Sequence, residues 1–114
     1  MTSILDQEEQ MRKLDQSDMF GFYVNAAKHY RESEKAAQKL KLSYSLPRNV
    51  VVAGLGGSAI GGELLKDYTR NVAKVPIEIS RNYQLPAYVD NHSLVVLASY
   101  SGDTEETLSS FLDA

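Results

Sequence analysis

Short apolar runs recur in the second part of this chain and predict three β-strands. The runs at 50–54 (VVVAG) and 93–99 (SLVVLAS) do not alternate with polar residues, which is typical of central strands covered on both faces in a parallel sheet. The run at 75–79 (VPIEI) predicts the third strand. Pro76 has no N–H for a sheet ladder, so this strand is expected at a sheet edge or with the proline in its first residues.

A helical spacing of apolar residues follows the first strand, within 58–70 (SAIGGELLKDYTR). The stripe comprises Ile60, Leu64, Leu65 and Tyr68 and predicts an amphipathic helix of about three turns. Gly61 and Gly62 lie early in this helix, where glycine is unfavourable, and are expected to allow close packing on a strand or across a subunit contact. A strand, a helix and a strand within about 30 residues predict a right-handed βαβ unit.

A second helix is predicted after the 93–99 strand. Asp103 or Thr104 is expected to cap it, and Glu106 follows Asp103 at the spacing of a capping box. Its acids Glu105 and Glu106 are interpreted as first-turn residues that interact favourably with the helix dipole. The inner face is predicted to comprise Leu108, Phe111 and Leu112.

Residues 1–46 contain no proline and one glycine, and they are rich in helix-forming residues. Ser17 or Asp18 is expected to cap a helix over 19–30 (MFGFYVNAAKHY), with RESEKAAQKL as its charged, solvated continuation. An apolar stripe along this segment is predicted to pack onto a core, and it comprises Phe22, Tyr23, Ala26, Ala27, Tyr30, Ala37 and Leu40. The chain is therefore expected to consist of a helical N-terminal segment, 1–46, and an α/β part, 47–114.

Composition and charge narrow the function classes. A chain of 114 residues with 43% apolar and 24% charged residues is typical of at most one folded domain. The net charge is −3 and the 12 Lys and Arg are spread out, which argues against nucleic acid and membrane partners. Without cysteine, and with His29 and His92 lacking ligand-like neighbours, no metal site is expected. No stretch resembles a signal peptide or a membrane span, so the cytoplasm is the expected location.

Two loops of one design carry the candidate chemistry. Residues 54–62 (GLGGSAIGG) and 99–107 (SYSGDTEET) each follow a strand and lead into a helix, so both are expected at the carboxyl edge of the sheet. Helix N-termini there offer N–H groups to an anion, glycines permit positive φ and close approach, and hydroxyl groups donate to phosphate oxygens. The candidates are Gly54, Gly56, Gly57 and Ser58 in the first loop, and Ser99, Ser101 and Thr104 in the second.

Other interpretations of the first loop compete with phosphate binding. Neither loop has the lysine of a Walker A motif, so a nucleoside triphosphate is not expected. A dinucleotide-binding module stays open, because Gly54, Gly56 and Ala59 fit G-x-G-x-x-A and Glu78 follows about 20 residues later. That interpretation is weakened because Glu78 lies within a strand rather than at its tip and because the second loop would have no role. A tight turn with only a structural role is the remaining alternative.

The order and spacing of these motifs resemble a known family. VVVAGLGGSAIGGELLKDY, VPIEISRNYQLPAYVD and LVVLASYSGDTEETL are similar to the sugar isomerase (SIS) domain at the start of the bifunctional phosphoglucose/phosphomannose isomerases. The resemblance covers about 47–112, and RKLDQSDMF also resembles the family's N-terminal segment. It implies a three-layer α/β/α parallel sheet of flavodoxin-like type, preceded by helices and incomplete here, with three strands where an SIS domain has five. The 93–99 strand would then keep an unpaired edge.

The resemblance also implies a function. Gly57, Ser58, Ser99, Ser101 and Thr104 would hold the phosphate of glucose 6-phosphate, mannose 6-phosphate or fructose 6-phosphate during aldose–ketose isomerisation through a cis-enediol, without a cofactor. Position 103 is more often Asn in the family, and the aspartate here is expected to act as a cap and to weaken phosphate binding by repulsion.

The family's base, a Glu, and its His, Arg and Lys lie downstream, so no catalytic residue is expected in this chain. It is interpreted as an N-terminal fragment, inactive alone, of a homodimeric enzyme of glycolysis and gluconeogenesis. The alternatives are a non-catalytic SIS module that senses a phosphosugar and, third, an NAD(P)-binding module.

Overall fold

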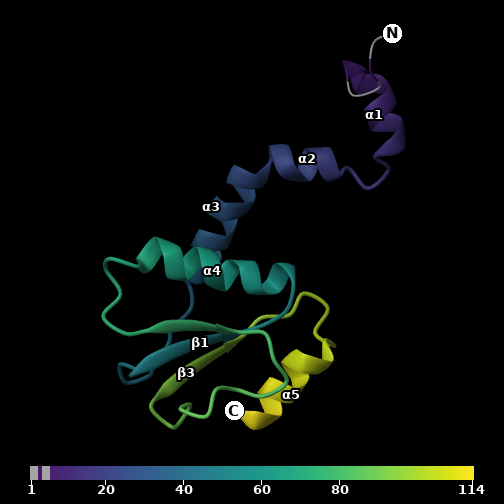
Figure 1. Ribbon diagram of the computed structural model, residues 1–114. Helices are drawn as coiled ribbons and strands as arrows, with labels where there is room; N and C mark the ends of the chain where they lie inside the picture. Colours follow the sequence, from purple (N-terminus) through teal and green to yellow (C-terminus); the bar gives the residue numbers. More distant parts are fainter. Residues whose placement is uncertain (1–2, 4–5) are drawn as a thin grey trace. The chain divides into compact units, whose positions relative to one another are not determined.

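The computed structural model describes residue 3 and residues 6–114. The chain forms two compact units, Met1–Ser43 and Tyr44–Ala114, joined in sequence at the end of the helical segment (Figure 1). The first unit is helical and the second holds the sheet, so the predicted α/β class with preceding helices is confirmed.

The described residues of the first unit form the α-helices α1 (Glu8–Leu14), α2 (Met19–Val24) and α3 (Ala26–Ala37). Asp18 is the N-cap of α2, because its carboxylate accepts a hydrogen bond from the Gly21 amide at 3.2 Å. It is one of the two caps expected from the sequence. The single helix expected over 19–30 is divided at Asn25, whose side-chain amide donates to the Gly21 carbonyl at 2.7 Å. An asparagine that bonds its own backbone in this way competes with helix continuation.

The apolar stripe of this unit forms no core within α2 and α3. Neither α2 nor α3 has a buried residue, and the side chains of Phe22 and Tyr30 are 57% and 68% exposed. The aromatic contacts that do form are local: the Phe22 ring stacks on His29 with centroids 5.0 Å apart and meets Tyr23 edge-on at 6.0 Å. Periodicity correctly predicted the stripe but not what covers it.

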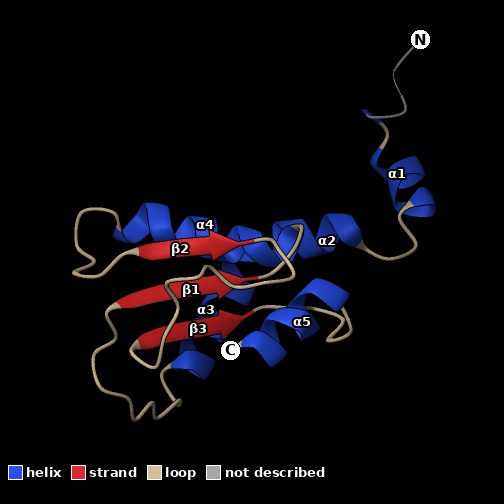
Figure 2. Ribbon diagram, turned by 60° about the horizontal axis from the view of Figure 1, so that its bottom comes forward, coloured by secondary structure: helices blue, strands red, loops and turns tan. Residues whose placement is uncertain are grey.

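The second unit is built on a parallel sheet in the order β2-β1-β3 (Figure 2), with β1 at Asn49–Ala53, β2 at Ile77–Ser80 and β3 at Ser93–Leu97. Val51 in β1 is fully buried, as predicted for a strand covered on both faces. The expected edge position of the strand after Pro76 is confirmed. β3 is the other edge strand and Val96 is 42% exposed, which contradicts the central position expected from its unalternating run. The unpaired edge expected for this strand in an incomplete sheet is confirmed.

Two helices lie on opposite faces of this sheet, α4 (Gly57–Thr69) and α5 (Glu105–Asp113) (Figures 1 and 2). The βαβ unit is confirmed, since β1, α4 and the parallel strand β2 follow one another. Gly62 lies against β1 and β2: a Cβ at Gly62 would be 2.9 Å from Val52 Cγ1 and 3.2 Å from Ile79 Cγ1. Close packing of helix on strand is therefore correct for Gly62 and wrong for Gly61, where a Cβ would meet nothing within 4 Å.

Small residues, rather than the apolar stripes, face the sheet. On α4 the buried residues are Ala59 and Gly62, and the predicted stripe of Ile60, Leu64, Leu65 and Tyr68 is exposed. On α5 the buried residues are Thr107 and Ser110, which corrects the predicted inner face of Leu108, Phe111 and Leu112. The Ser110 hydroxyl donates to the Asn82 carbonyl at 3.1 Å, so the buried face of α5 bonds the segment after β2 instead of packing on apolar side chains.

Candidate functional site: two loops at one edge of the sheet

The second loop gathers its three predicted hydroxyl groups around one atom. Thr104 Oγ1 lies 3.2 Å from Ser99 Oγ and 3.4 Å from Ser101 Oγ. Two backbone amides hold the serines in place: the Gly102 amide donates to Ser99 Oγ at 3.0 Å and the Asp103 amide to Ser101 Oγ at 3.4 Å. Gly102 has a φ of 79°, a conformation that side-chain-bearing residues rarely adopt, and it lets the loop turn back on itself.

Thr104 occupies the cap position of α5 without capping it. Its backbone has φ −63° and ψ 118°, but its side chain makes no hydrogen bond to the first amides of the helix. The capping box expected between Asp103 and Glu106 therefore does not form, because Thr104, one residue later, is the N-cap. The Thr104 hydroxyl is directed to the two serines instead, and the helix amides are left without a side-chain cap.

The first loop joins β1 to α4 through Gly56, the N-cap, whose φ is 51° and ψ −128°. Of the candidate glycines 54, 56 and 57, Gly56 is the one with a positive φ. The amides of Ser58 and Ala59 donate to the carbonyls of Leu55 and Gly56 at 3.0 and 3.2 Å and so belong to the turn itself. Open space surrounds Gly57, where a Cβ would meet nothing within 4 Å.

The two loops leave neighbouring parallel strands, and they meet at Gly54. A Cβ at this glycine would lie 2.7 Å from the Ala98 carbonyl oxygen and 3.5 Å from Ser58 Cβ. In the part of the chain that the structure describes, no hydrogen bond joins Gly57 or Ser58 to the second-loop hydroxyl cluster of Ser99, Ser101 and Thr104. The structure thus brings together the three second-loop candidates, and it places the first-loop pair at the start of α4, which follows the adjacent strand β1.

Charged side chains border this edge of the sheet. Arg81 directly follows β2 and pairs with Glu63 of α4 at 2.9 Å. Sequence reasoning missed this arginine, although a basic residue just after a strand was a visible signal. Glu105 and Glu106 stand in the first turn of α5, as expected. Tyr83 donates to Glu105 at 3.4 Å, and the negative charge of Glu106 is the main cause that raises the pKa of Tyr83 above its ordinary value.

Glu78, the candidate ribose ligand of the dinucleotide interpretation, is engaged elsewhere. It lies within β2, opposite Val51, and its carboxylate accepts a hydrogen bond from the Tyr88 hydroxyl at 2.6 Å. Burial first, and then the bond to Glu78, raise the pKa of Tyr88 to about 12. Glu78 also borders a cleft with Asn49 and Pro76, at the amino ends of the strands and so opposite the glycine loop.

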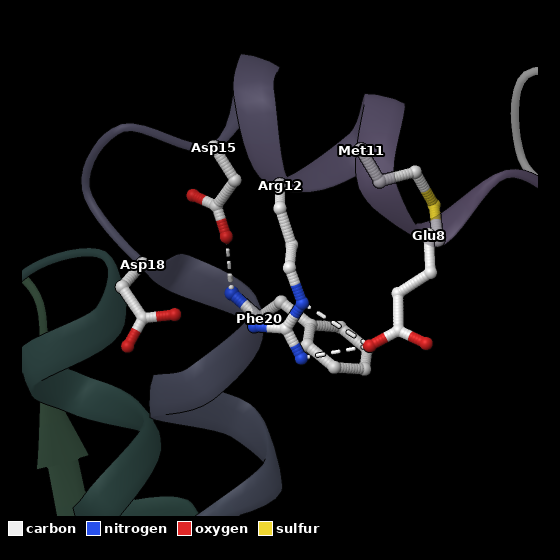
Figure 3. A pocket seen from close by; sticks show the side chains of 6 residues that line it. All are labelled: Glu8, Met11, Arg12, Asp15, Asp18 and Phe20. Carbon is white, nitrogen blue, oxygen red and sulfur yellow. Dashed lines mark hydrogen bonds and ion pairs between the residues drawn. The ribbon is translucent and has the colours of Figure 1, made fainter.

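A separate cleft of about 330 Å³ lies in the first unit (Figure 3). In it Arg12 bonds Glu8 at 2.8 Å, and Asp15 accepts hydrogen bonds from the amides of Met19 and Phe20 at 2.8 and 2.7 Å. Asp15 thus holds the turn between α1 and α2, whereas the Glu8–Arg12 pair lies within α1. None of the five predicted site residues lies there.

Two features are absent among the described residues. No group of three His, Cys, Asp or Glu is arranged to hold a metal ion there. No helix there is long and apolar enough to cross a membrane.

The chain is similar to curated proteins of one kind. A bifunctional phosphoglucose/phosphomannose isomerase of Caldicellulosiruptor bescii is 57% identical over 65 residues, which is 57% of this chain and 19% of that protein. Proteins of the same name from Thermoplasma acidophilum and Aquifex aeolicus are 38% and 40% identical over 66 and 68 residues, covering 58% and 59% of this chain and 20% and 21% of each relative. No protein-family model and no solved structure matches the chain.

The matched part thus spans about one fifth of the length of these curated relatives. Over that part the resemblance predicted from the sequence motifs is confirmed. Over its matched residues the chain is similar to the bifunctional phosphoglucose/phosphomannose isomerases.

Proposed function

We propose that the two loops bind the phosphate group of a sugar phosphate. The observation that carries this proposal is the convergence of the Ser99, Ser101 and Thr104 hydroxyl groups at the carboxyl edge of a parallel sheet. Ser58, half-buried on the adjacent loop, supplies a fourth hydroxyl, and the exposed backbone of Gly57 gives an anion access to the start of α4.

The chemistry of this set suits a phosphate. Phosphate oxygens accept several hydrogen bonds at once, and hydroxyl and amide donors provide them without a fixed positive charge. Both α4, with 13 residues, and α5, with 9, begin at this edge and direct the positive ends of their dipoles toward it. The uncapped start of α5 adds amides that a phosphate would satisfy.

The substrates we propose are glucose 6-phosphate and mannose 6-phosphate, interconverted with fructose 6-phosphate, because the relatives are named as phosphoglucose/phosphomannose isomerases. Aldose–ketose isomerisation needs a base that moves a proton between C2 and C1. Asp103 and Glu105 flank Thr104 in the chain, and a carboxylate at a phosphate subsite would repel its ligand, so neither is assigned this role. The loops are proposed to anchor and orient the substrate, with proton transfer carried out by residues outside this chain.

The segment 47–114 is accordingly proposed as the first part of an SIS domain in a homodimeric enzyme. A non-catalytic phosphosugar-binding module would use the same second-loop hydroxyl cluster and differ in lacking the base. The dinucleotide interpretation has less support, because Glu78 is engaged by Tyr88 away from the glycine loop.

The proposal is tested by titrating the chain with fructose 6-phosphate, unphosphorylated fructose and NADH, with NMR shifts of the backbone amides as the readout. We expect fructose 6-phosphate to shift the amides of 57–58 and 99–104, and fructose to leave them unchanged. Thr104→Val should weaken binding by about 10-fold to 100-fold, since a hydrogen bond to a charged group contributes about 1.5–3 kcal/mol. Thr69→Val is the matched control, because the Thr69 hydroxyl donates to the Leu65 carbonyl within α4.

Binding of NADH without binding of fructose 6-phosphate would overturn the proposal. Equal shifts with fructose and fructose 6-phosphate would also contradict it, because the phosphate would then contribute nothing.

A further inference from the structure

Gly54 lies at the point where the two phosphate-binding loops approach each other. A Cβ at this position would be 2.7 Å from the Ala98 carbonyl oxygen, 3.4 Å from Ala98 Cβ and 3.5 Å from Ser58 Cβ. The first distance is too short for any real carbon–oxygen contact, and its partner is a backbone atom, which cannot turn away as a flexible side chain can. A glycine is therefore required here by the backbone of Ala98, just after β3.

The backbone on both sides of the contact is held in the sheet. The Gly54 amide donates to the Ser80 carbonyl of β2 at 3.1 Å, and the Ala98 amide donates to the Ala53 carbonyl of β1 at 2.8 Å. Relieving the clash by moving either segment would strain one of these bonds. The displacement would pass directly to the loops, because Ala98 precedes Ser99 and the Ser58 side chain lies against Gly54.

We infer that Gly54 is a positioning residue whose missing side chain sets the spacing between the glycine loop and the second-loop hydroxyl cluster, so that both reach one phosphate. This inference rests on the proposed phosphate binding. Hydrogen bonds weaken steeply outside about 2.7–3.2 Å, so a relaxation of several tenths of an ångström at Gly54 removes one loop from the phosphate.

The test compares Gly54→Ala with Gly61→Ala, a glycine-to-alanine change that points into open space within α4 and is not among the candidate phosphate-binding residues. Binding of fructose 6-phosphate and of inorganic phosphate is measured by calorimetry on the 114-residue chain, after NMR spectra show that each variant is folded. We expect Gly54→Ala to weaken fructose 6-phosphate binding by about 10-fold or more, the loss of one charged hydrogen bond, and Gly61→Ala to leave it unchanged.

A double-mutant cycle with Thr104→Val separates positioning from general destabilisation. If the spacing is lost in Gly54→Ala, the threonine no longer reaches the phosphate, and Thr104→Val should add less than about 2-fold in that background. Full additivity of the two changes would overturn the inference, as would wild-type affinity in Gly54→Ala. If the unmodified chain binds no phosphosugar, it is the proposed function that fails, not the spacing alone.

A second measurement applies if Gly54→Ala does not fold. During titration of the unmodified chain with fructose 6-phosphate, the Gly54 and Ala98 amide signals should shift with the same apparent Kd as those of Ser58 and Ser101. Signals from Gly54 and Ala98 that stay fixed while both loops respond would overturn the inference.

Discussion

Gly61 and Gly62 are neighbours in α4, yet the structure predicts that alanine has opposite effects at the two positions. A Cβ at Gly61 would point into open space, whereas one at Gly62 would lie 2.9 Å from Val52 Cγ1, 3.0 Å from Val52 Cβ and 3.2 Å from Ile79 Cγ1. Both glycines are interior to a helix of 13 residues, so the change in helix propensity is nearly the same for each.

The magnitudes follow from two effects. Replacing glycine by alanine inside a helix stabilises it by about 0.5–1 kcal/mol, and this gain applies at both positions. At Gly62 the added carbon must displace Val52, a residue of the central strand, and overpacking of this kind costs about 1–3 kcal/mol. Gly61→Ala should therefore raise the free energy of unfolding by up to about 1 kcal/mol. Gly62→Ala should lower it by up to about 2 kcal/mol relative to the unmodified chain.

Urea unfolding followed by circular dichroism measures both variants against the unmodified chain. The gain in helix propensity is the same in both variants, so it cancels when their free energies of unfolding are subtracted. The difference is then the overpacking cost, about 1–3 kcal/mol, which corresponds to roughly one molar in the urea midpoint. The slopes should agree, since neither change alters the surface exposed on unfolding. Equal stabilisation by both substitutions would refute the packing of α4 on β1 and β2 described above.

Three further outcomes are expected. Asp103→Asn should tighten fructose 6-phosphate binding by about 2-fold to 10-fold at low salt, because it removes a carboxylate that repels the phosphate. The gain should be much smaller at about 0.3 M salt, where this repulsion is screened. Calorimetry measures both affinities, and equal affinities of the variant and the unmodified chain at low salt would contradict the prediction. Gly102→Ala should lower the urea midpoint, because alanine at a φ of 79° costs about 1–2 kcal/mol; an unchanged midpoint would count against that loop conformation. The pKa of Tyr88 is raised to about 12, so its contribution to stability is complete below pH 10 and is lost as the pH rises through 12. Tyr88→Phe should therefore remove one group from the high-pH part of the tyrosinate absorbance titration, and loss of a group that titrates near pH 10 instead would refute the Glu78–Tyr88 contact.

The elements of the α/β part were predictable because their signals are local. Unalternating valines predict a doubly covered strand, and the positions of β1 and α4 follow from VVVAG and the helical stripe after it. Pro76 correctly predicted an edge, since a missing N–H is a property of the residue alone. The meeting of the two loops was equally predictable, because parallel neighbouring strands end at the same edge.

The orientation of the helices was not predictable from the same signals. A stripe such as Ile60, Leu64 and Tyr68 shows that one face of a helix is apolar, but it does not show what covers that face. On α4 the face toward the sheet is selected by size, because Gly62 allows an approach that a larger residue would prevent. On α5 it is selected by hydrogen bonding, since Ser110 bonds the chain after β2.

Thr104 shows why the role of a loop residue cannot be decided from sequence. A threonine that caps a helix and a threonine that binds phosphate give the same sequence pattern. Here Thr104 occupies the N-cap position, but its hydroxyl contacts Ser99, as proposed for a phosphate-binding residue. Leaving the helix start without its side-chain cap costs about 1 kcal/mol. A phosphate seated among the three hydroxyls would satisfy those amides and recover the loss. Binding should then raise the free energy of unfolding by the mass-action amount, about 2.7 kcal/mol at 100 times the Kd.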